Sequence, residues 1–308
     1  HKMNSELIPH WEYNGKRYAS KTVCFEHAGE DWRKVHFNLY DSVFVKQDWT
    51  DRPSTDIKSL YDHRICQLRE KYDYVRVLYS GGTDSTAILE AAMRNDIHID
   101  ELVICYAADG DYINRAETDR AVKILEQFKP KLKYTKFTHI AYDKQDITEH
   151  WKYQNQLSGH LYYPSTPQSL EYHYLYTSKS DIMKALWSPV DRGLSHCDVF
   201  GKEPSSITEY NGEPVWFLTD NKVVYHTTAW SEWFYTSPDL PEFQNLQNHL
   251  SLDIMTKYGV RTCDPLSFDE QGWKDVCKIT KRYYHPDARN DKMRSGTRKD
   301  LMRVYEYV

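Results

Sequence analysis

The feature that most constrains the fold is a pair of adjacent glycines between a predicted strand and a predicted helix. Residues 75–79 read Val-Arg-Val-Leu-Tyr and predict a strand, while residues 85–94 carry a helical pattern of apolar positions. The connecting segment consists of Ser80, Gly81, Gly82, Thr83, Asp84 and Ser85. Glycine is scarce elsewhere, with 12 glycines in 308 residues, so two in succession mark a sharp turn. The chain is therefore expected to pass from strand into helix through a tight bend.

The alternation of strand and helix continues around this bend. Residues 102–106 form an apolar run without polar interruption, which is typical of a parallel strand buried on both faces. Further helices are predicted at 56–71 and 114–128, and further strands at 135–141 and 197–200. Short connections between alternating elements predict an α/β fold with a parallel-sheet, Rossmann-like core over residues 56–206.

The segments on either side of this core have different patterns. Residues 1–55 predict a small β-rich extension, in which Asn14-Gly15 lies between short aromatic runs and indicates a hairpin. Residues 207–308 predict a mixed, mostly helical region for binding a substrate or partner, with a second hairpin turn at 209–212. The chain is thus expected to consist of three parts.

The chemistry of the glycine bend is that of a phosphate-binding site. A helix N-terminus presents backbone N–H groups and a partial positive charge to an anion, and glycines let the backbone approach phosphate closely. Asp84 repels a bare anion, which indicates either a cap on the helix or a metal ion that bridges to phosphate. A strand–helix turn capped by Asp84 and Ser85, with no ligand, is the structural alternative.

The six residues 80–85 resemble the PP-loop (SGGxDS) of the N-type ATP pyrophosphatases, in the adenine nucleotide alpha hydrolase-like superfamily. The segments 201–205 and 234–238 also resemble bacteriophage PP-loop proteins with an asparagine-synthetase-like core. The chain has neither the Gly-x-x-x-x-Gly-Lys of a Walker A loop nor the Gly-x-Gly of a dinucleotide fingerprint. The resemblance therefore indicates a PP-loop nucleotide site and not one of these other two kinds.

The resemblance implies that the chain cleaves ATP to AMP and pyrophosphate. Such enzymes transfer AMP to a carboxylate, amide or carbonyl oxygen of a small molecule, and ammonia or another amine then displaces it. It implies that residues 80–85 bind the pyrophosphate together with Mg²⁺, and that Asp84 is both catalytic and a metal ligand. It also implies that Tyr106 and Ala107, after the second strand, contact the adenine.

Physical chemistry adds the requirement for a cation facing the bend. Expulsion of pyrophosphate needs its developing charge to be neutralised by fixed donors, cations and metal. Lys202 follows a predicted strand end, where ligands of open α/β sheets bind, so it is the expected catalytic cation. Relatives often have an acidic residue at this strand end, which makes Glu203 a candidate metal ligand. An exposed loop lysine is the alternative for Lys202.

Composition excludes several other classes. Six cysteines with no Cys-x-x-Cys pair argue against a disulfide framework and against a clustered zinc site. The longest apolar run, 102–108, is far shorter than the ~20 residues of a membrane span. With no apolar signal segment after His1-Lys2, which resembles a tag remnant, a soluble cytoplasmic chain without membrane partners is expected, in the host cytoplasm if phage-encoded.

The acceptor substrate is left open by the sequence. The segment 278–303 has nine Lys or Arg and three Asp residues, a net charge of +6 in a chain of net charge −5. An enzyme that adenylates a base in tRNA or DNA, held by this segment, is one alternative to a small-molecule ligase. A nucleotide-binding module without turnover is another. Substrate contacts, in any of these cases, are expected from Trp233, Phe234 and Tyr235.

Overall fold

The computed structural model describes residues 10–18, 21–107, 115–142, 193–201, 206–217, 231–259 and 261. Its helices are α1 (Lys21–Ala28), α2 (Asp41–Phe44), α3 (Ile57–Lys71), α4 (Thr83–Arg94), α5 (Arg115–Phe128) and α10 (Pro241–Tyr258), with 3-10 turns η2 (Gly29–Lys34) and η3 (Lys129–Lys131). Its strands are β1 (His10–Tyr13), β2 (Lys16–Tyr18), β3 (His36–Asn38), β4 (Tyr74–Leu78), β5 (Glu101–Ala107), β6 (Lys136–Tyr142), β7 (His196–Phe200), β8 (Ser206–Tyr210), β9 (Glu213–Phe217) and β10 (Ser231–Trp233).

The centre of the fold is a five-stranded parallel sheet with the strand order β10-β7-β4-β5-β6. The chain starts this sheet at β4, runs outward through β5 and β6, and then returns to the other side of β4 with β7 and β10. The strand order therefore reverses between β4 and β7, as in doubly wound nucleotide-binding folds. The predicted α/β, Rossmann-like core is confirmed by this topology.

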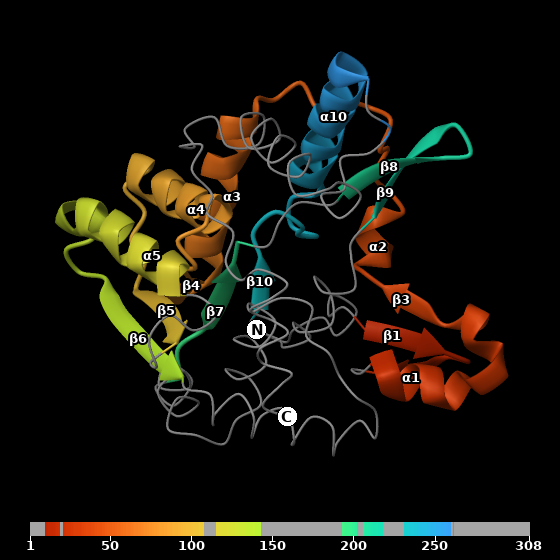
Figure 1. Cartoon of the computed structure of the whole chain (residues 1–308), viewed down its shortest axis with the longest axis horizontal. Helices are drawn as coiled ribbons and strands as arrows, with labels where there is room; N and C mark the ends of the chain where they lie inside the picture. Colours follow the sequence, from red (N-terminus) through yellow and green to blue (C-terminus); the bar gives the residue numbers. More distant parts are fainter. Residues whose placement is uncertain are drawn as a thin grey trace.

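Helices α3, α4 and α5 lie together on one side of the sheet (Figure 1). Their apolar faces pack on alternate strand residues such as Val75 and Val77, which are 0% exposed. Ile65 of α3 and Ile88 of α4 are fully buried in the same core, to which Phe243 of α10 also belongs. This packing fixes the start of α4 relative to the sheet.

The opposite face of the sheet carries buried charges. Arg76 of β4 is 0% exposed and lies between two carboxylates, with its Nε 3.3 Å from Glu101 Oε2 and 3.4 Å from Asp198 Oδ1. The three residues occupy the neighbouring strands β4, β5 and β7. Because Arg76 contacts both flanking strands, this cluster ties the centre of the sheet together.

The segments that flank the sheet follow their predicted turn chemistry. Strands β1, β2 and β3 form the small antiparallel sheet expected at the N-terminus, with Asn14 and Gly15 in the left-handed conformation at the turn. Strands β8 and β9 pair around Asn211 and Gly212, which have the same backbone conformation. Both Asn-Gly hairpins are confirmed. Strand β10 pairs with β7, so the core sheet extends past the boundary expected at residue 206.

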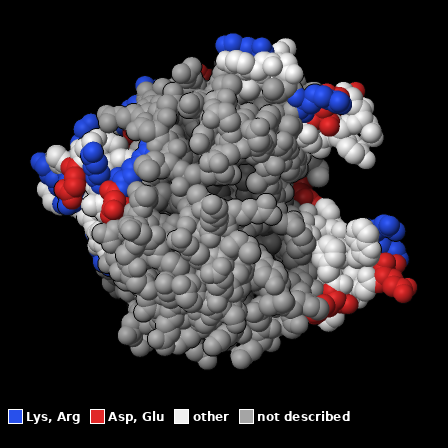
Figure 2. All heavy atoms as spheres, viewed as in Figure 1, with Lys and Arg blue, Asp and Glu red and all other residues white. Residues whose placement is uncertain are grey.

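The surface of the described residues carries charges of both signs. Figure 2 shows Lys and Arg side chains among Asp and Glu side chains at the edge where α4 and α5 lie. Among the helices that the structure describes, none combines the length and the apolar character needed to cross a membrane. The basic segment 278–303 lies outside the described residues.

Candidate functional site

The glycine bend lies at the carboxyl end of β4, beside the point where the strand order reverses. Strand β4 ends at Leu78, and α4 begins at Thr83, two residues before the predicted helix. In open parallel sheets, the crevice for a ligand forms at the carboxyl edge of the strands where the order reverses. The topology therefore brings the six predicted residues to the expected place for a ligand.

Hydroxyl groups within the bend hold its shape. Ser85 Oγ donates to the Gly82 carbonyl oxygen over 3.2 Å and lies 3.3 Å from the Ser80 amide nitrogen, which donates to it. Ser80 Oγ accepts from the Gly82 amide over 3.2 Å. Ser80 and Ser85, which are predicted to bind pyrophosphate, thus also hold the loop together through their hydroxyl groups.

Gly81 has both a conformation and a contact that exclude a side chain. Its φ is +74°, in the left-handed region that favours glycine. A Cβ at this position would lie 2.5 Å from the Ala121 Cβ and 2.7 Å from the Ala121 Cα on α5. The loop therefore packs directly on α5, and a side chain at residue 81 would separate them.

The first turn of α4 supplies backbone donors at the bend. The first hydrogen bond of the helix runs from the Thr86 amide to the Gly82 carbonyl over 3.0 Å. The amides of Thr83, Asp84 and Ser85 precede this bond and have no acceptor within the helix. The N-cap residue is Gly82, which has no side chain to cap them. A helix start whose N-cap residue makes no capping bond suits an anion.

Gly201, directly after β7, lies close to the Ser85 end of this turn. A Cβ on Gly201 would lie 2.9 Å from the Ser85 amide nitrogen, 2.9 Å from its Cα and 3.1 Å from the Asp84 carbonyl carbon. Contacts below 3.0 Å to backbone cannot be relieved without moving the loop or the strand end. The absence of a side chain at residue 201 therefore lets the end of β7 approach the first turn of α4 closely.

Tyr235 supports the bend from the protein interior. Its hydroxyl donates a 2.7 Å hydrogen bond to the Asp84 carbonyl oxygen and accepts one from the Tyr61 hydroxyl over 3.2 Å. The side chains of Tyr235 and Phe234 are 1% and 0% exposed and pack against Tyr61 and Phe243. The prediction that Phe234 and Tyr235 contact a substrate is therefore wrong, and we assign these two rings to the core.

The remaining predicted residues are placed only in part. Tyr106 and Ala107 are the last two residues of β5, so their backbone lies at the same edge of the sheet as the bend. Lys202 and Glu203 lie outside the described residues, although Gly201 brings the chain to the start of α4 immediately before them. Their roles stay predictions.

The carboxylates near the bend are few among the described residues. Asp84 is 5% exposed and is the acidic residue in the first turn of α4. No group of three or more His, Cys, Asp or Glu side chains that could hold a metal occurs within the described ranges. Mg²⁺ in nucleotide sites commonly uses one or two carboxylates together with phosphate oxygens and water. Asp84 therefore fits as the protein's contribution to such a site.

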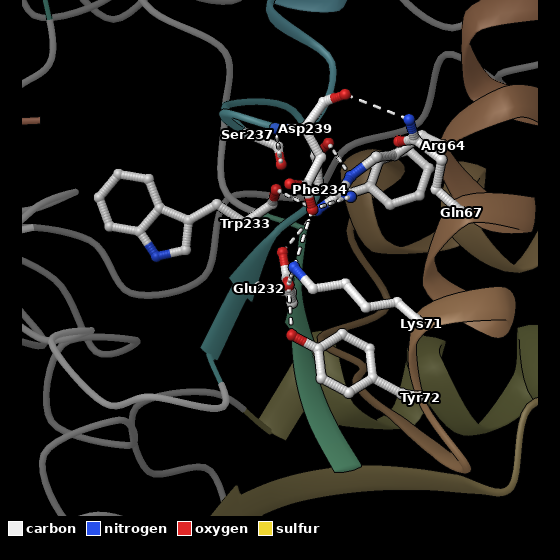
Figure 3. A network of polar contacts seen from close by, with 9 residues as sticks. All are labelled: Arg64, Gln67, Lys71, Tyr72, Glu232, Trp233, Phe234, Ser237 and Asp239. Carbon is white, nitrogen blue, oxygen red and sulfur yellow. Dashed lines mark hydrogen bonds and ion pairs between the residues drawn. The ribbon is translucent and has the colours of Figure 1, made fainter. Parts of the chain in front are cut away.

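A network of charged side chains joins α3 to the end of β10 (Figure 3). Arg64 Nη2 is 2.7 Å and Lys71 Nζ 2.8 Å from the Glu232 carboxylate, and the Tyr72 hydroxyl donates to Glu232 over 2.5 Å. Burial alone would raise the pKa of Glu232, but the cations of Arg64 and Lys71 outweigh it and lower this pKa to about 2. Lys71 also pairs with Asp239 over 2.8 Å. The network fixes the segment that carries Tyr235.

Three residues that support the bend were not assigned to it from the sequence: Ala121, Gly201 and Tyr235. The signal for Gly201 was its position directly after a predicted strand, next to Lys202. Tyr235 lies 151 positions from Asp84, and no local pattern indicates that contact. Ala121 is one small residue on a helix, and the sequence gives no sign that it contacts Gly81.

Comparisons with known proteins found similar solved structures but no matching family. No family model matches the chain, and no curated protein matches it. Among solved structures, the chain is similar to the NH3-dependent NAD synthetase from Campylobacter jejuni subsp. jejuni NCTC 11168, in complex with the nitrate ion. The two share 13% sequence identity with a TM-score of 0.34, over 79% of this chain and 100% of that chain. A likeness of this size carries no argument about activity.

Proposed function

We propose that the chain is an ATP pyrophosphatase of the adenylating, C–N bond-forming type. The observation that carries the proposal is the glycine bend at the carboxyl end of β4, which opens α4 with a glycine at its N-cap. Three first-turn amides and the positive end of the helix dipole suit a polyphosphate at this point. The resemblance of residues 80–85 to the PP-loop supports ATP as the nucleotide.

The proposed reaction has two steps. In the first, a carboxylate, amide or carbonyl oxygen of the acceptor attacks the α-phosphorus of ATP, and the bond from that phosphorus to the α–β bridging oxygen breaks. Pyrophosphate leaves with the electron pair. In the second, the nitrogen of ammonia or another amine attacks the activated carbon, AMP leaves, and the nitrogen releases a proton to water.

The residues of the bend contribute to the first step by holding the leaving group. The amides of Thr83, Asp84 and Ser85 donate to pyrophosphate oxygens, where charge develops as the bond breaks. Bound Mg²⁺ supplies further neutralisation of that charge, with Asp84 as the proposed ligand and Glu203 as a second. Lys202 is proposed as the cation that faces the leaving group, since the preceding Gly201 contacts the first turn of α4.

The proposal is tested by product analysis with Mg²⁺, ATP, ammonium and the small-molecule fraction of a cell extract as the source of acceptor. Wild-type protein is expected to form AMP and pyrophosphate in equal amounts. Asp84→Ala should reduce this release at least about a hundredfold while the fold is retained. Glu90→Gln, which removes a carboxylate from the same helix, is the matched control and should retain activity. Formation of ADP and phosphate, or full activity in Asp84→Ala, contradicts the proposal.

A further inference from the structure

The peptide group between Asp84 and Ser85 is contacted from two sides by segments distant in sequence. The Tyr235 hydroxyl donates to its carbonyl oxygen over 2.7 Å. On the Ser85 side, a Cβ at Gly201 would lie 2.9 Å from the nitrogen of the same peptide group. Because a peptide group is planar, an interaction that holds its carbonyl also fixes the direction of its N–H. The two contacts together leave this peptide little freedom to rotate.

The direction of the hydrogen bonds around Tyr235 is fixed as well. The Tyr61 hydroxyl donates to the Tyr235 oxygen over 3.2 Å, so the proton of Tyr235 is directed to the Asp84 carbonyl. Burial raises the pKa of both tyrosines well above the ordinary value, and their side chains are 2% and 1% exposed. Both hydroxyls therefore stay protonated at neutral pH, and Tyr235 is a constant donor.

We propose that Tyr235 is a positioning residue of the phosphate-binding bend, which aims the Ser85 N–H at the bound anion by holding the Asp84 carbonyl. A hydrogen bond accepted by the carbonyl also polarises the amide and strengthens its N–H as a donor. Tyr235 acts through the backbone and does not touch the ligand. The inference rests on the proposed function, because it needs a phosphate group at the start of α4.

The test compares two full-length variants that each remove one hydroxyl from the same buried aromatic cluster. Tyr235→Phe breaks the bond to Asp84, whereas Tyr61→Phe breaks the bond between the two tyrosines and keeps the hydroxyl that donates to Asp84. Calorimetry with magnesium pyrophosphate as the probe should show a loss of affinity of about five- to tenfold for Tyr235→Phe and less than about twofold for Tyr61→Phe. Thermal melting of both variants checks that they lose similar stability.

A second readout reports on the peptide itself. In protein labelled with ¹⁵N-serine, the Ser85 amide proton should shift upfield in Tyr235→Phe without ligand, and stay close to its wild-type position in Tyr61→Phe. Gly201→Ala approaches the same peptide from its other side, and should weaken pyrophosphate binding by about tenfold or more even if Tyr235→Phe does not fold.

Two results would overturn the inference and are distinguishable. In the first, Tyr235→Phe and Tyr61→Phe bind pyrophosphate equally well, and the chemical shift of the Ser85 amide proton is unchanged. Tyr235 would then be a core residue without a positioning role, while the proposed function stands. Wild-type protein that does not bind magnesium pyrophosphate would overturn both the positioning role and the proposed function.

Discussion

Two buried polar regions meet at the segment Glu232–Tyr235, and they are built in opposite ways. At Glu232, a carboxylate is surrounded by the charged groups of Arg64 and Lys71 (Figure 3). At Tyr235, three residues further on, a neutral hydroxyl holds a backbone carbonyl of the glycine bend. The first region matches charge with charge inside the protein, and the second uses hydroxyls, glycines and backbone dipoles.

This difference separates a structural ion-pair network from the proposed ligand site. In the Glu232 network, the protein itself supplies the counter-charges, so binding an anion or cation there would require breaking ion pairs. At the bend, the amides at the start of α4 precede the helical ladder, and Gly201 places no side chain against the Ser85 amide. Substitutions in the first region are expected to change stability, and those in the second to change ligand binding.

The largest effect on stability is expected from Glu232→Gln. Removing this charge leaves Arg64, which is 0% exposed, without its close partner, and loss of one partner of a buried pair costs about 4 kcal/mol. Chemical denaturation at pH 7 measures this loss. Glu209→Gln is the control because its pair with Arg261 is exposed, and it should change stability by less than about 1 kcal/mol. Similar losses in both variants would remove the distinction between the two kinds of ion pair.

The same variant gives a pH test with a definite sign. The folded-state pKa of Glu232 is lowered from its ordinary 4.5 to about 2, so its contribution to stability is present above pH 4.5 and is lost as the pH falls towards 2. The difference in unfolding free energy between wild type and Glu232→Gln should therefore shrink by about 3 kcal/mol across this window. A constant difference from pH 6 to pH 2 would mean that the charge of Glu232 does not carry the effect.

Gly81→Ala tests the second region, and the chain offers a matched control in Gly15. The two glycines have φ of +74° and +73°, but a Cβ at Gly15 meets nothing within 4 Å while one at Gly81 meets Ala121 at 2.5 Å. Gly15→Ala should cost about 1 kcal/mol for its backbone conformation alone. Gly81→Ala should cost about 3 kcal/mol, because the loop or α5 must also move. It should also abolish magnesium pyrophosphate binding, whereas Gly15→Ala should leave that affinity unchanged.

Binding that survives in Gly81→Ala would show that the bend tolerates displacement from α5. The contact with Ala121 would then be a matter of packing and not of site geometry. Equal costs in the two glycine variants would point to the same conclusion.

The parts of the fold that were predicted from sequence depend on local chemistry. The two Asn-Gly hairpins follow from the left-handed conformation that these residues adopt readily, and the bend follows from adjacent glycines between strand and helix. The parallel sheet follows from alternation of strand and helix patterns along the chain. Each of these signals lies within a few neighbouring residues.

The parts that were not predicted depend on contacts between distant residues. Strand β10 has three residues, too few for a period of two to be recognised, and it joins the sheet by pairing with β7. Arg64 and Glu232 are 168 positions apart, and each has an ordinary sequence context. Trp233, Phe234 and Tyr235 look like an exposed aromatic run until the sheet and α3 place the last two in the core. These contacts arise when distant segments pack together, and no local sequence pattern predicts them.

Helix α10 carries a third buried polar region. Its side chains are neutral amides, unlike the charged groups around Glu232, and they bond partly to one another and partly to backbone carbonyls. Gln244 accepts from Thr236 and donates to Asn248 over 2.7 and 2.8 Å, and Asn245 donates to the carbonyls of Asp48 and Asp51. Gln247 is 0% exposed, and in the described structure neither of its amide atoms has a hydrogen-bond partner. A buried amide in that state is unfavourable by about 1–3 kcal/mol.

The smallest expected effect, and the only stabilising one, is therefore that of Gln247→Met. The unbranched thioether keeps the shape of the side chain and removes the two unpaired polar atoms, so the free energy of unfolding should rise by about 1 kcal/mol. Gln244→Met is the matched control on the same helix, and should lower stability by about 2 kcal/mol because Thr236 and Asn248 lose their partner. A loss of stability in Gln247→Met would mean that the Gln247 amide stabilises the fold, as the ion pairs of Glu232 do. A gain would show that a buried polar group can persist on α10 without contributing to the fold.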